Sequence, residues 1–174
     1  KLPLDLRIVD VHAIVHAALE TVDAEVNQKQ LDVVLKLDRA PAHVWGDAVR
    51  LQQIFWNVLK NAVKFTPARG RLEVSSFVDV AAGNVQVRVT DTGIGLTSTE
   101  LARIFDAFVQ GDHAGSGGSH RFGGVGLGLA ISQMLAEQHH GTIRAESPGR
   151  DQGATFVIEL PLATPASELS RPED

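Results

Sequence analysis

The 174-residue chain contains no cysteine. A disulfide framework, a zinc site built on thiolates and a cysteine nucleophile are therefore excluded. No apolar run approaches the roughly 18 residues that a membrane-spanning helix needs, and the first residues lack the basic-then-apolar pattern of a secretion signal. Positive charge is also scarce, with 16 Lys and Arg against 21 Asp and Glu and a net charge of −5. A nucleic-acid partner normally requires a clustered basic face, so we expect contact with neither nucleic acid nor a membrane.

Apolar patterning predicts one domain over residues 1–163, followed by a tail or the start of a linker over residues 164–174. Period-two alternation predicts strands at 2–8, 31–37, 43–45, 72–78, 85–89, 142–147 and 154–160. Stripes of period 3.6 predict long helices at 10–26, 47–66 and 126–141, and a capping box predicts a short helix from 97 towards 105.

The hairpin signal Ala82-Gly83-Asn84 means that the sheet is mixed rather than all parallel. We therefore expect an α/β fold, a two-layer α/β sandwich in which three long helices cover one face of a mixed sheet of about five strands. The glycine-rich stretch 109–123 has no periodicity and is predicted to be a mobile loop.

The second predicted helix carries a polar stripe opposite its apolar one, formed by Arg50, Gln53, Asn57, Asn61 and Lys64. Such a stripe is by default a solvated face. However, each asparagine costs about 0.5 kcal/mol in helix propensity relative to alanine, so two of them one turn apart also suggest a ligand. An amide oxygen is a neutral ligand for Mg²⁺, which takes its other ligands from phosphates and water. Both interpretations stay open on this stripe alone.

Asp91 stands in the wrong phase of its strand. Val85, Val87 and Val89 form the apolar phase, and Asp91 continues it, so its carboxylate is expected to point towards the interior. A carboxylate at the bottom of an apolar slot can accept from the amino group of adenine, whereas it would repel the carbonyl oxygen of guanine. The alternative, that Asp91 only accepts from turn amides, is equally consistent with the sequence.

A glycine run, Gly-Gly-Val-Gly-Leu-Gly at 123–128, stands at the start of the third long helix. Amides at a helix N-terminus attract anions, and glycines allow a phosphate to come close, although such runs are often plain hinges. The dinucleotide pattern G-x-G-x-x-G fails here, no glycine precedes a lysine as a Walker A loop requires, and the eukaryotic-type kinase motifs are missing.

Read together and in order, these motifs resemble the ATP-binding catalytic domain of sensor histidine kinases, within the GHKL ATPase superfamily. The resemblance covers an N-box at 57–67, a G1 box at 91–96, an F-box at 104–108, a G2 box at 123–130 and a last glycine motif at 153–156. Their order and spacing over nearly the whole chain are highly specific. The resemblance implies ATP and Mg²⁺ as cofactors.

The resemblance assigns the phosphate end of the site. It implies that Asn61 coordinates Mg²⁺, that Asn57 helps to position metal and phosphates, and that Lys64 touches phosphate. Arg121, in the glycine-rich loop, would be a further phosphate contact, although a solvated cation is an equal alternative. Asn57, Lys64 and Arg121 would form the catalytic set. Backbone amides would hold the triphosphate at Gly123, Gly124, Val125, Gly126, Leu127 and Gly128. Many relatives have Thr or Ser at the place of Val125, so a hydroxyl contact is missing here.

The resemblance also assigns the base end. Asp91 would accept from the adenine amino group, Phe65 would pack near the base, and Gly93 and Gly95 would make room for it. The remaining nucleotide contacts implied are Phe105, Phe108 and Thr155.

Relatives that hydrolyse ATP carry a glutamate where this chain has Asn57, and an amide cannot take a proton from water. The implied reaction is transfer of the γ-phosphoryl group to a histidine on a separate dimerisation and phosphoacceptor hairpin, N-terminal in the parent protein. None of the seven histidines here is followed by Glu or Asp, as that acceptor typically is. A response-regulator receiver domain would act downstream, and the domain would be cytoplasmic. The alternatives are an anti-sigma-type serine/threonine kinase of the same superfamily and a non-catalytic nucleotide-binding module.

Overall fold

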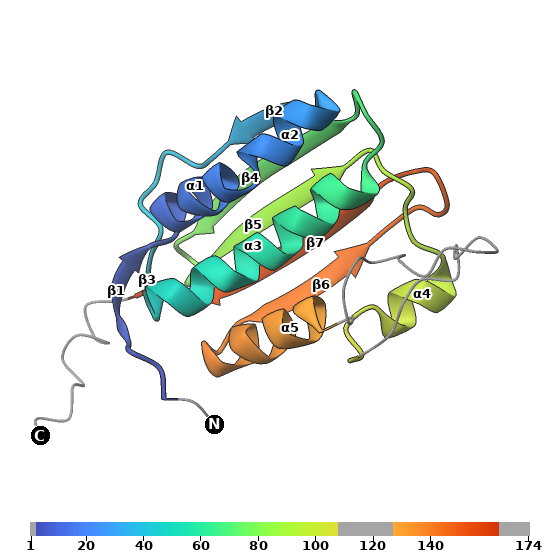
Figure 1. Ribbon diagram of the computed structural model, residues 1–174. Coiled ribbons are helices and arrows are strands. Elements are labelled where there is room, and N and C mark those ends of the chain that lie inside the picture. Colours follow the sequence, from blue (N-terminus) through green and yellow to red (C-terminus); the bar gives the residue numbers. More distant parts are fainter. Residues whose placement is uncertain (1–2, 108–126, 164–174) are drawn as a thin grey trace, which may run out of the picture.

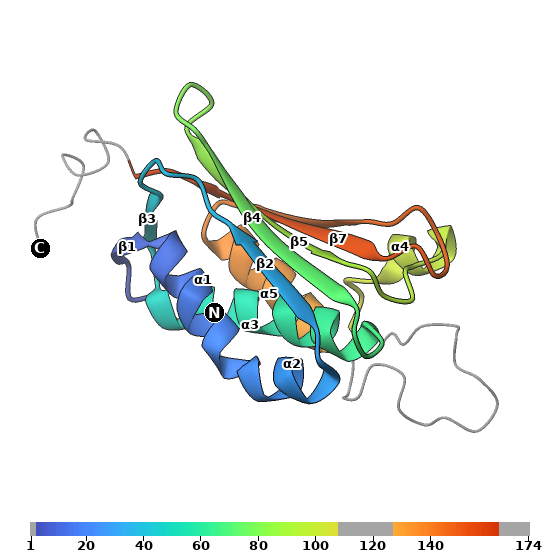
Figure 2. The same ribbon diagram turned by 90° about the horizontal axis from the view of Figure 1, so that it is seen from above.

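The computed structural model describes residues 3–107 and 127–163, in which helices cover one face of a twisted sheet (Figure 1, Figure 2). The strands are β1 (Arg7–Asp10), β2 (Asp32–Lys36), β3 (His43–Gly46), β4 (Arg71–Asp79), β5 (Asn84–Asp91), β6 (Thr142–Glu146) and β7 (Ala154–Pro161). The helices are α1 (Val11–Thr21), α2 (Asp23–Lys29), α3 (Ala48–Phe65), α4 (Ser98–Arg103) and α5 (Gly128–Gln138).

The main sheet has the strand order β2-β4-β5-β7-β6. Strands β2 and β4 pair in parallel and the other neighbours are antiparallel, which confirms the predicted mixed sheet of five strands. Strands β1 and β3 form a separate antiparallel pair. The β4–β5 hairpin turns at Gly83, whose φ of 73° lies in the left-handed region that glycine adopts most easily.

Helix α3 lies across the middle of the sheet, between α1 and α5 (Figure 1). It begins where predicted because the Asp47 carboxylate accepts from the Val49 and Arg50 amides. It ends at Phe65, and Thr66 is extended because helical geometry is disfavoured for a residue that precedes a proline, here Pro67. Its apolar stripe is buried as predicted, and each large side chain contributes about 1.5–3 kcal/mol relative to exposure. The stripe consists of Leu51, Ile54, Phe55, Val58, Leu59 and Ala62.

Two predictions near the N-terminus were wrong in detail. The strand expected at 2–8 begins only at Arg7, and Leu6, one of its supposed inward residues, is 50% exposed. The strand forms later because its backbone partner is the short β3, rather than an edge of the main sheet. The helix expected at 10–26 is interrupted at Val22, whose amide donates to the Leu19 carbonyl. Val22 itself stays buried, so the apolar stripe runs on from α1 into α2 despite the break.

The end of α5 also differs from the prediction. The helix was expected to run to 141 but ends at Gln138, and His140 follows in the left-handed region with a φ of 60°. The His140 amide donates to the Glu137 carbonyl and the Gly141 amide to the Ala136 carbonyl, which is a Schellman motif. Glycine is needed at 141 for a different reason, since a Cβ there would overlap the Glu159 carbonyl oxygen of β7.

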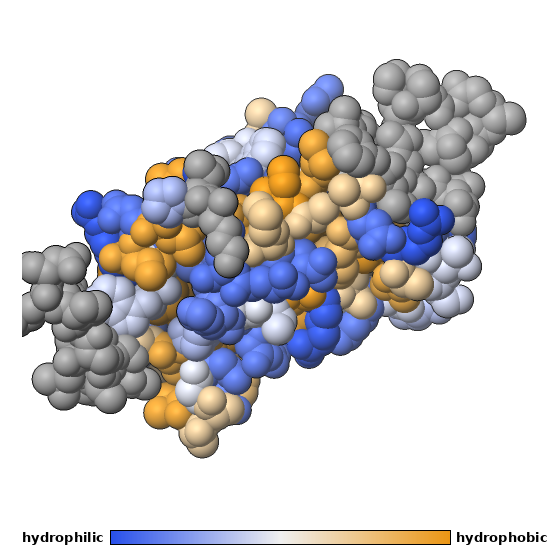
Figure 3. All heavy atoms as spheres, turned by 90° about the horizontal axis from the view of Figure 1, so that it is seen from below, coloured by the Kyte–Doolittle hydropathy of each residue, from blue (hydrophilic) through white to orange (hydrophobic). Residues whose placement is uncertain are grey.

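The surface of the described residues is mixed. Large apolar side chains are exposed singly, including Val49 on α3, Phe77 on β4 and Met134 on α5. Seen from below, hydrophilic residues divide the hydrophobic areas (Figure 3). Within residues 3–107 and 127–163, no helix combines the length and apolar character needed to cross a bilayer.

Candidate functional site

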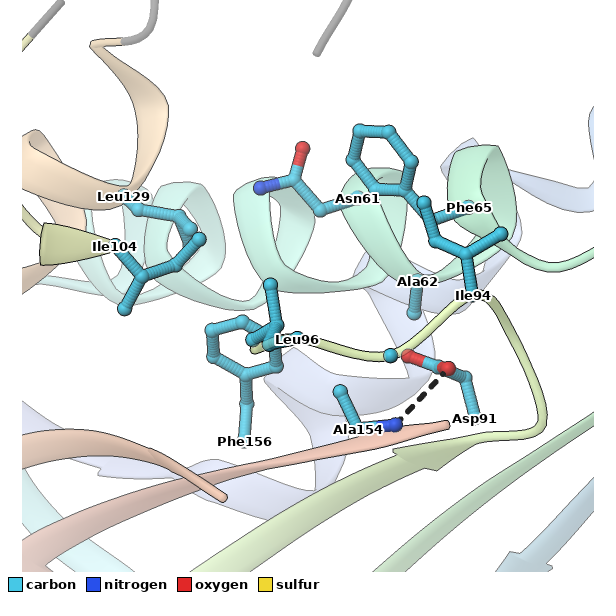
Figure 4. A pocket seen from close by; sticks show the side chains of 11 residues that line it. Asn61, Ala62, Phe65, Asp91, Ile94, Leu96, Ile104, Leu129, Ala154 and Phe156 are labelled. Atoms are coloured by element: carbon cyan, nitrogen blue, oxygen red, sulfur yellow. Dashed lines mark hydrogen bonds between the residues drawn. The ribbon is translucent and has the colours of Figure 1, made fainter. Parts of the chain in front are cut away.

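A hollow of about 380 Å³, partly open to solvent, lies where the C-terminal half of α3 faces the end of β5 (Figure 4). Asn61 and Phe65 of α3 stand on one side of it, and Asp91 stands on the sheet side (Figure 4). Its full lining is Asn61, Ala62, Phe65, Asp91, Ile94, Gly95, Leu96, Ile104, Leu129, Ala154 and Phe156. The hollow therefore joins five segments that are far apart in the sequence, and each of the five belongs to one of the predicted motifs.

Asp91 is the last residue of β5 and is only 6% exposed, as its strand phase predicted. Its Oδ1 accepts from the Gly93 amide at 2.8 Å and from the Ala154 amide at 3.3 Å. Burial raises the pKa of the Asp91 carboxyl, and these two amide hydrogen bonds oppose the rise. Within the described residues, no hydrogen bond reaches its Oδ2. One oxygen of a buried carboxylate is thus held by the fold, while the other can accept from a ligand.

The loop after Asp91 packs backbone to backbone against the turn between β6 and β7. The Gly153 amide donates to the Gly93 carbonyl at 3.0 Å, and the Asp151 amide donates to the Ile94 carbonyl at 2.7 Å. Gly95 has a φ of 66°, and a Cβ there would overlap the Gly149 carbonyl oxygen. Gly95 therefore lets two backbone segments meet, and because it also lines the hollow, the role of Gly93 and Gly95 in making room for a base stays a prediction.

Apolar side chains close the remaining sides of the hollow. Seven of them were not among the predicted contacts, namely Ala62, Ile94, Leu96, Ile104, Leu129, Ala154 and Phe156. Strand alternation could have found Phe156, because it shares the inward phase of β7 with Ala154. The predicted Phe105 does not line the hollow but packs edge-on against Phe156, with ring centroids 6.3 Å apart. Such walls exclude water and favour a flat apolar ligand.

The two asparagines of α3 have different surroundings. Asn61 lines the hollow, and its amide group stands above it (Figure 4). Asn57 is only 8% exposed and its Nδ2 donates to the Gly128 carbonyl and to the Ser132 hydroxyl of α5, both at 3.0 Å. The predicted polar stripe is therefore not a uniform solvated face, because one of its members joins α3 to α5.

Lys64 does not line the hollow of Asp91. Its ammonium lies 5.6 Å from the centre of the Phe65 ring, and the side chain borders a second hollow together with Lys29 and Lys60. Desolvation, and then the charges of Lys60 and Lys29, lower the pKa of Lys64. Lys29 donates to the carbonyls of Val63, Lys64 and Thr66 at 2.8, 2.8 and 3.0 Å, and so caps the C-terminus of α3.

Three further predicted contacts can be located. Leu127 and Gly128 form the first turn of α5, where the Ile131 amide donates to the Leu127 carbonyl. Thr155 lies on the opposite face of the sheet from the hollow, where its hydroxyl is 3.0 Å from that of Thr90. Thr155 is therefore not retained in the site proposed below. The other predicted residues, Phe108, Arg121, Gly123, Gly124, Val125 and Gly126, lie outside the described residues.

The side chains around the hollow could bind a metal ion only if a ligand supplied most of the coordinating oxygens. Across the parts of the chain that the structure describes, no three His, Cys, Asp or Glu side chains gather into a metal site. A cation near Asn61 would have amide oxygen from the protein and would need further oxygens from its ligand and from water. Magnesium bound to a triphosphate meets this condition, because it usually keeps waters and phosphate oxygens.

Residues 46–164 match the model of a family described as Histidine kinase-, DNA gyrase B-, and HSP90-like ATPase. This range includes α3, the hollow, α5 and the last four strands of the main sheet in chain order.

Similar curated proteins are bacterial sensor kinases. Autoinducer 2 sensor kinase/phosphatase LuxQ of Vibrio vulnificus (strain YJ016) is 42% identical over 120 residues, which are 67% of this chain and 13% of that protein. Sensor protein GacS of Pseudomonas syringae pv. syringae is 36% identical over 166 residues, 93% of this chain and 18% of that protein. Sensor histidine kinase RcsC of Escherichia coli (strain K12) is 37% identical over 139 residues, 79% of this chain and 14% of that protein. The chain thus spans less than a fifth of the length of these relatives.

Solved structures agree with this. Full-length ShkA in complex with AMPPNP matches with a TM-score of 0.79 and 31% identity, covering 94% of this chain and 32% of that one. Mycobacterial sensor histidine kinase MprB matches with a TM-score of 0.74 and 27% identity, covering 90% of this chain and 97% of that one. The catalytic domain of histidine kinase ThkA matches with a TM-score of 0.77 and 21% identity, covering 91% of this chain and 98% of that one. At this identity the match supports the fold alone.

Proposed function

Because the chain belongs to the family described as Histidine kinase-, DNA gyrase B-, and HSP90-like ATPase, we propose that it binds Mg-ATP and supplies the γ-phosphoryl group to a histidine on a separate helical domain. A receiver domain of a response regulator would then take the group from that histidine. The observation that carries the proposal is the buried carboxylate of Asp91, one oxygen of which is left for a ligand at the bottom of an apolar hollow. We assign the activity to the cytoplasm, where ATP is available.

Base recognition follows from the chemistry of Asp91. Its Oδ1 is held by the Gly93 and Ala154 amides, so the orientation of the carboxylate is fixed before any ligand arrives. The outer oxygen can accept from the amino group of adenine, while Phe65 and Phe156 offer flat apolar contact. A guanine would present its carbonyl oxygen to the same carboxylate, and we therefore propose a preference for ATP over GTP.

The phosphate end of the site would be formed by α3 and by the start of α5. Asn61 would supply a neutral oxygen to magnesium, and the metal, when bound, would neutralise charge on the phosphates. The first turn of α5, whose N-cap residue Leu127 makes no side-chain capping bond within the described residues, offers backbone amides and the positive end of the helix dipole. Lys64, one turn after Asn61, would provide a cation near the phosphates. The amides of the undescribed residues 123–126 and the side chain of Arg121 stay predicted contacts of the same kind.

Transfer to a protein acceptor, rather than to water, is favoured by the identity of residue 57. An amide cannot act as a general base, and the Nδ2 of Asn57 is already engaged with α5. The side chains named here would therefore bind and orient the nucleotide without activating a water molecule, and the acceptor histidine would itself attack the γ-phosphorus.

The test is to incubate the full-length protein that contains this domain with ATP labelled on the γ-phosphate. We expect an acid-labile, base-stable label, which is the signature of phosphohistidine. An Asn61→Ala variant should lose the Mg²⁺ dependence of labelling, whereas Ser76→Ala, on β4, should label normally.

Phosphoserine would instead indicate a kinase of the anti-sigma type. Nucleotide binding without any transfer would indicate a non-catalytic module, and absence of nucleotide binding would refute the proposal entirely.

A further inference from the structure

Ser132 is a polar side chain with no exposed surface, in the second turn of α5. Its hydroxyl donates to the Gly128 carbonyl at 2.9 Å and accepts from Asn57 Nδ2 at 3.0 Å. Asn57 Nδ2 also donates to the Gly128 carbonyl at 3.0 Å. Three groups, from α3 and from the first two turns of α5, thus form a closed hydrogen-bonded triangle beside the proposed phosphate end.

The triangle determines which way the Asn57 amide faces. A carbonyl oxygen can only accept, so the end of the amide that lies against Gly128 must be its NH₂ group. The two hydrogens of that group are used by the Gly128 carbonyl and the Ser132 hydroxyl, and the amide oxygen is therefore turned away from these two acceptors. It lies beside the α-carbon side of Gly128, where an added Cβ would be 3.5 Å from it. Within the described residues, no hydrogen bond reaches this oxygen.

The position of Asn57 on α3 places its amide oxygen on the same side of the helix as Asn61. Asn57 stands one helical turn before Asn61, on the same side of α3, and residues four apart in a helix lie above one another. With the oxygen turned away from the Gly128 carbonyl and the Ser132 hydroxyl, Asn57 can contribute a second amide oxygen next to that of Asn61. With the amide turned over, it would present NH₂ donors, which cannot bind a cation.

We propose that Ser132 is a positioning residue, which holds the Asn57 amide with its oxygen towards the Mg²⁺ of the bound nucleotide or towards a water on that ion. This assignment rests on the proposed function. Ser132 itself touches neither metal nor phosphate and acts only through Asn57. Partners of this kind, which orient a ligand side chain, typically change metal affinity by about 10- to 100-fold when removed.

The experiment measures the dissociation constant of a non-hydrolysable ATP analogue by calorimetry, with Mg²⁺ and with a chelator. The ratio of the two constants is the Mg²⁺ enhancement. We expect Ser132→Ala to reduce this enhancement about tenfold, with affinity in chelator changed less than about twofold. Asn57→Ala should reduce it similarly, and Ser132→Ala should have no further effect in the Asn57→Ala background. Ser76→Ala, which removes a hydroxyl from β4 far from this triangle, should leave it unchanged.

A second readout needs no nucleotide. The side-chain NH₂ protons of Asn57 should exchange with solvent more slowly in the wild-type chain than in Ser132→Ala, as measured by NMR. Thermal unfolding of each variant verifies that it is folded.

The outcomes separate two failures. If the wild-type chain binds no ATP analogue, both the proposed function and this assignment are refuted. If the wild-type chain binds with Mg²⁺ enhancement and Ser132→Ala keeps that enhancement, only the assignment is refuted. It is also refuted if Ser132→Ala weakens binding equally with and without Mg²⁺, or if its effect persists in the Asn57→Ala background, because a purely structural role would give those results.

Discussion

Replacing Asp91 with asparagine tests the base pocket most directly, because the structure fixes how the new side chain would lie. The Gly93 and Ala154 amides both donate to Oδ1, at 2.8 and 3.3 Å, so the carbonyl oxygen of the asparagine must take that position. Its NH₂ group then replaces Oδ2, the oxygen proposed to accept from adenine. A donor would face a donor, while every hydrogen bond within the protein would be kept.

The magnitude follows from these contacts. A hydrogen bond to a charged group is worth about 1.5–3 kcal/mol, and leaving a buried donor without a partner costs about 1–3 kcal/mol. These are two estimates of the same loss and are not added. We expect ATP binding to weaken by about 2–3 kcal/mol, which corresponds to roughly 30- to 150-fold in Kd. The fold should not weaken, because burial raises the pKa of Asp91, which means that the ionised carboxylate is disfavoured in the folded chain. An uncharged side chain of the same shape avoids that cost.

The assay is calorimetric titration of wild type and Asp91→Asn with ATP and with GTP, together with thermal unfolding. We expect the ATP preference to shrink or reverse, since the new NH₂ group can donate to the carbonyl oxygen of guanine. Unchanged ATP affinity in a folded variant would show that Asp91 does not contact the base. Equal losses for both nucleotides would show that the substitution acts on the shape of the hollow rather than on base recognition.

Three further outcomes are expected. Because burial raises the pKa of Asp91, ATP affinity should fall on acidification at a pH above the ordinary aspartate value of about 3.9, and calorimetry on Asp91→Asn should lack this step. The raised pKa of Asp91 also makes a contribution to the free energy of unfolding, which is fully present below the pKa of this group in the unfolded chain. Urea titrations at a series of pH values should show this contribution disappearing as the pH rises through the pKa of Asp91 in the folded chain. Lys29→Met should lower the free energy of unfolding by about 1–2 kcal/mol by removing three hydrogen bonds to the end of α3, and a variant as stable as wild type would contradict that capping role. Gly95→Ala should lower the free energy of unfolding, measured in urea, by about 2–4 kcal/mol. Gly83→Ala should lower it by only about 1 kcal/mol, because Gly83 has a similar φ but an added Cβ there meets no neighbour. Equal losses for the two variants would refute the argument that Gly95 is required by its contact with the Gly149 carbonyl.

Sequence reasoning succeeded where a local pattern has one physical solution. Asp47 and Pro67 bracket α3 because a capping carboxylate and a proline act on their immediate neighbours. Asp91 was placed inside the molecule because strand alternation is strict over the four residues that precede it. The paired Thr97 and Glu100 capping box at α4 formed for the same local reason.

Predictions failed or stayed incomplete where the answer depends on a partner distant in the chain. The alternation at 2–8 is a correct local pattern, but backbone pairing with β3 decides where the strand begins. Asn57 looked like a member of an exposed stripe because α5, which covers it, is about 70 residues further along the chain. Leu129 lies in α5 and Ile104 directly follows α4, and only the tertiary structure shows that both reach the hollow.

The roles gathered on α3 restrict how the gene for this domain can vary in length. A single inserted residue would rotate everything beyond it by about 100°, which would separate Asn61 from the hollow or the apolar stripe from the sheet. Deletions within the helix carry the same penalty. The turn at Gly83, where an added Cβ would meet no neighbour, carries no residue of the hollow, and length variation among homologous genes should therefore be concentrated there.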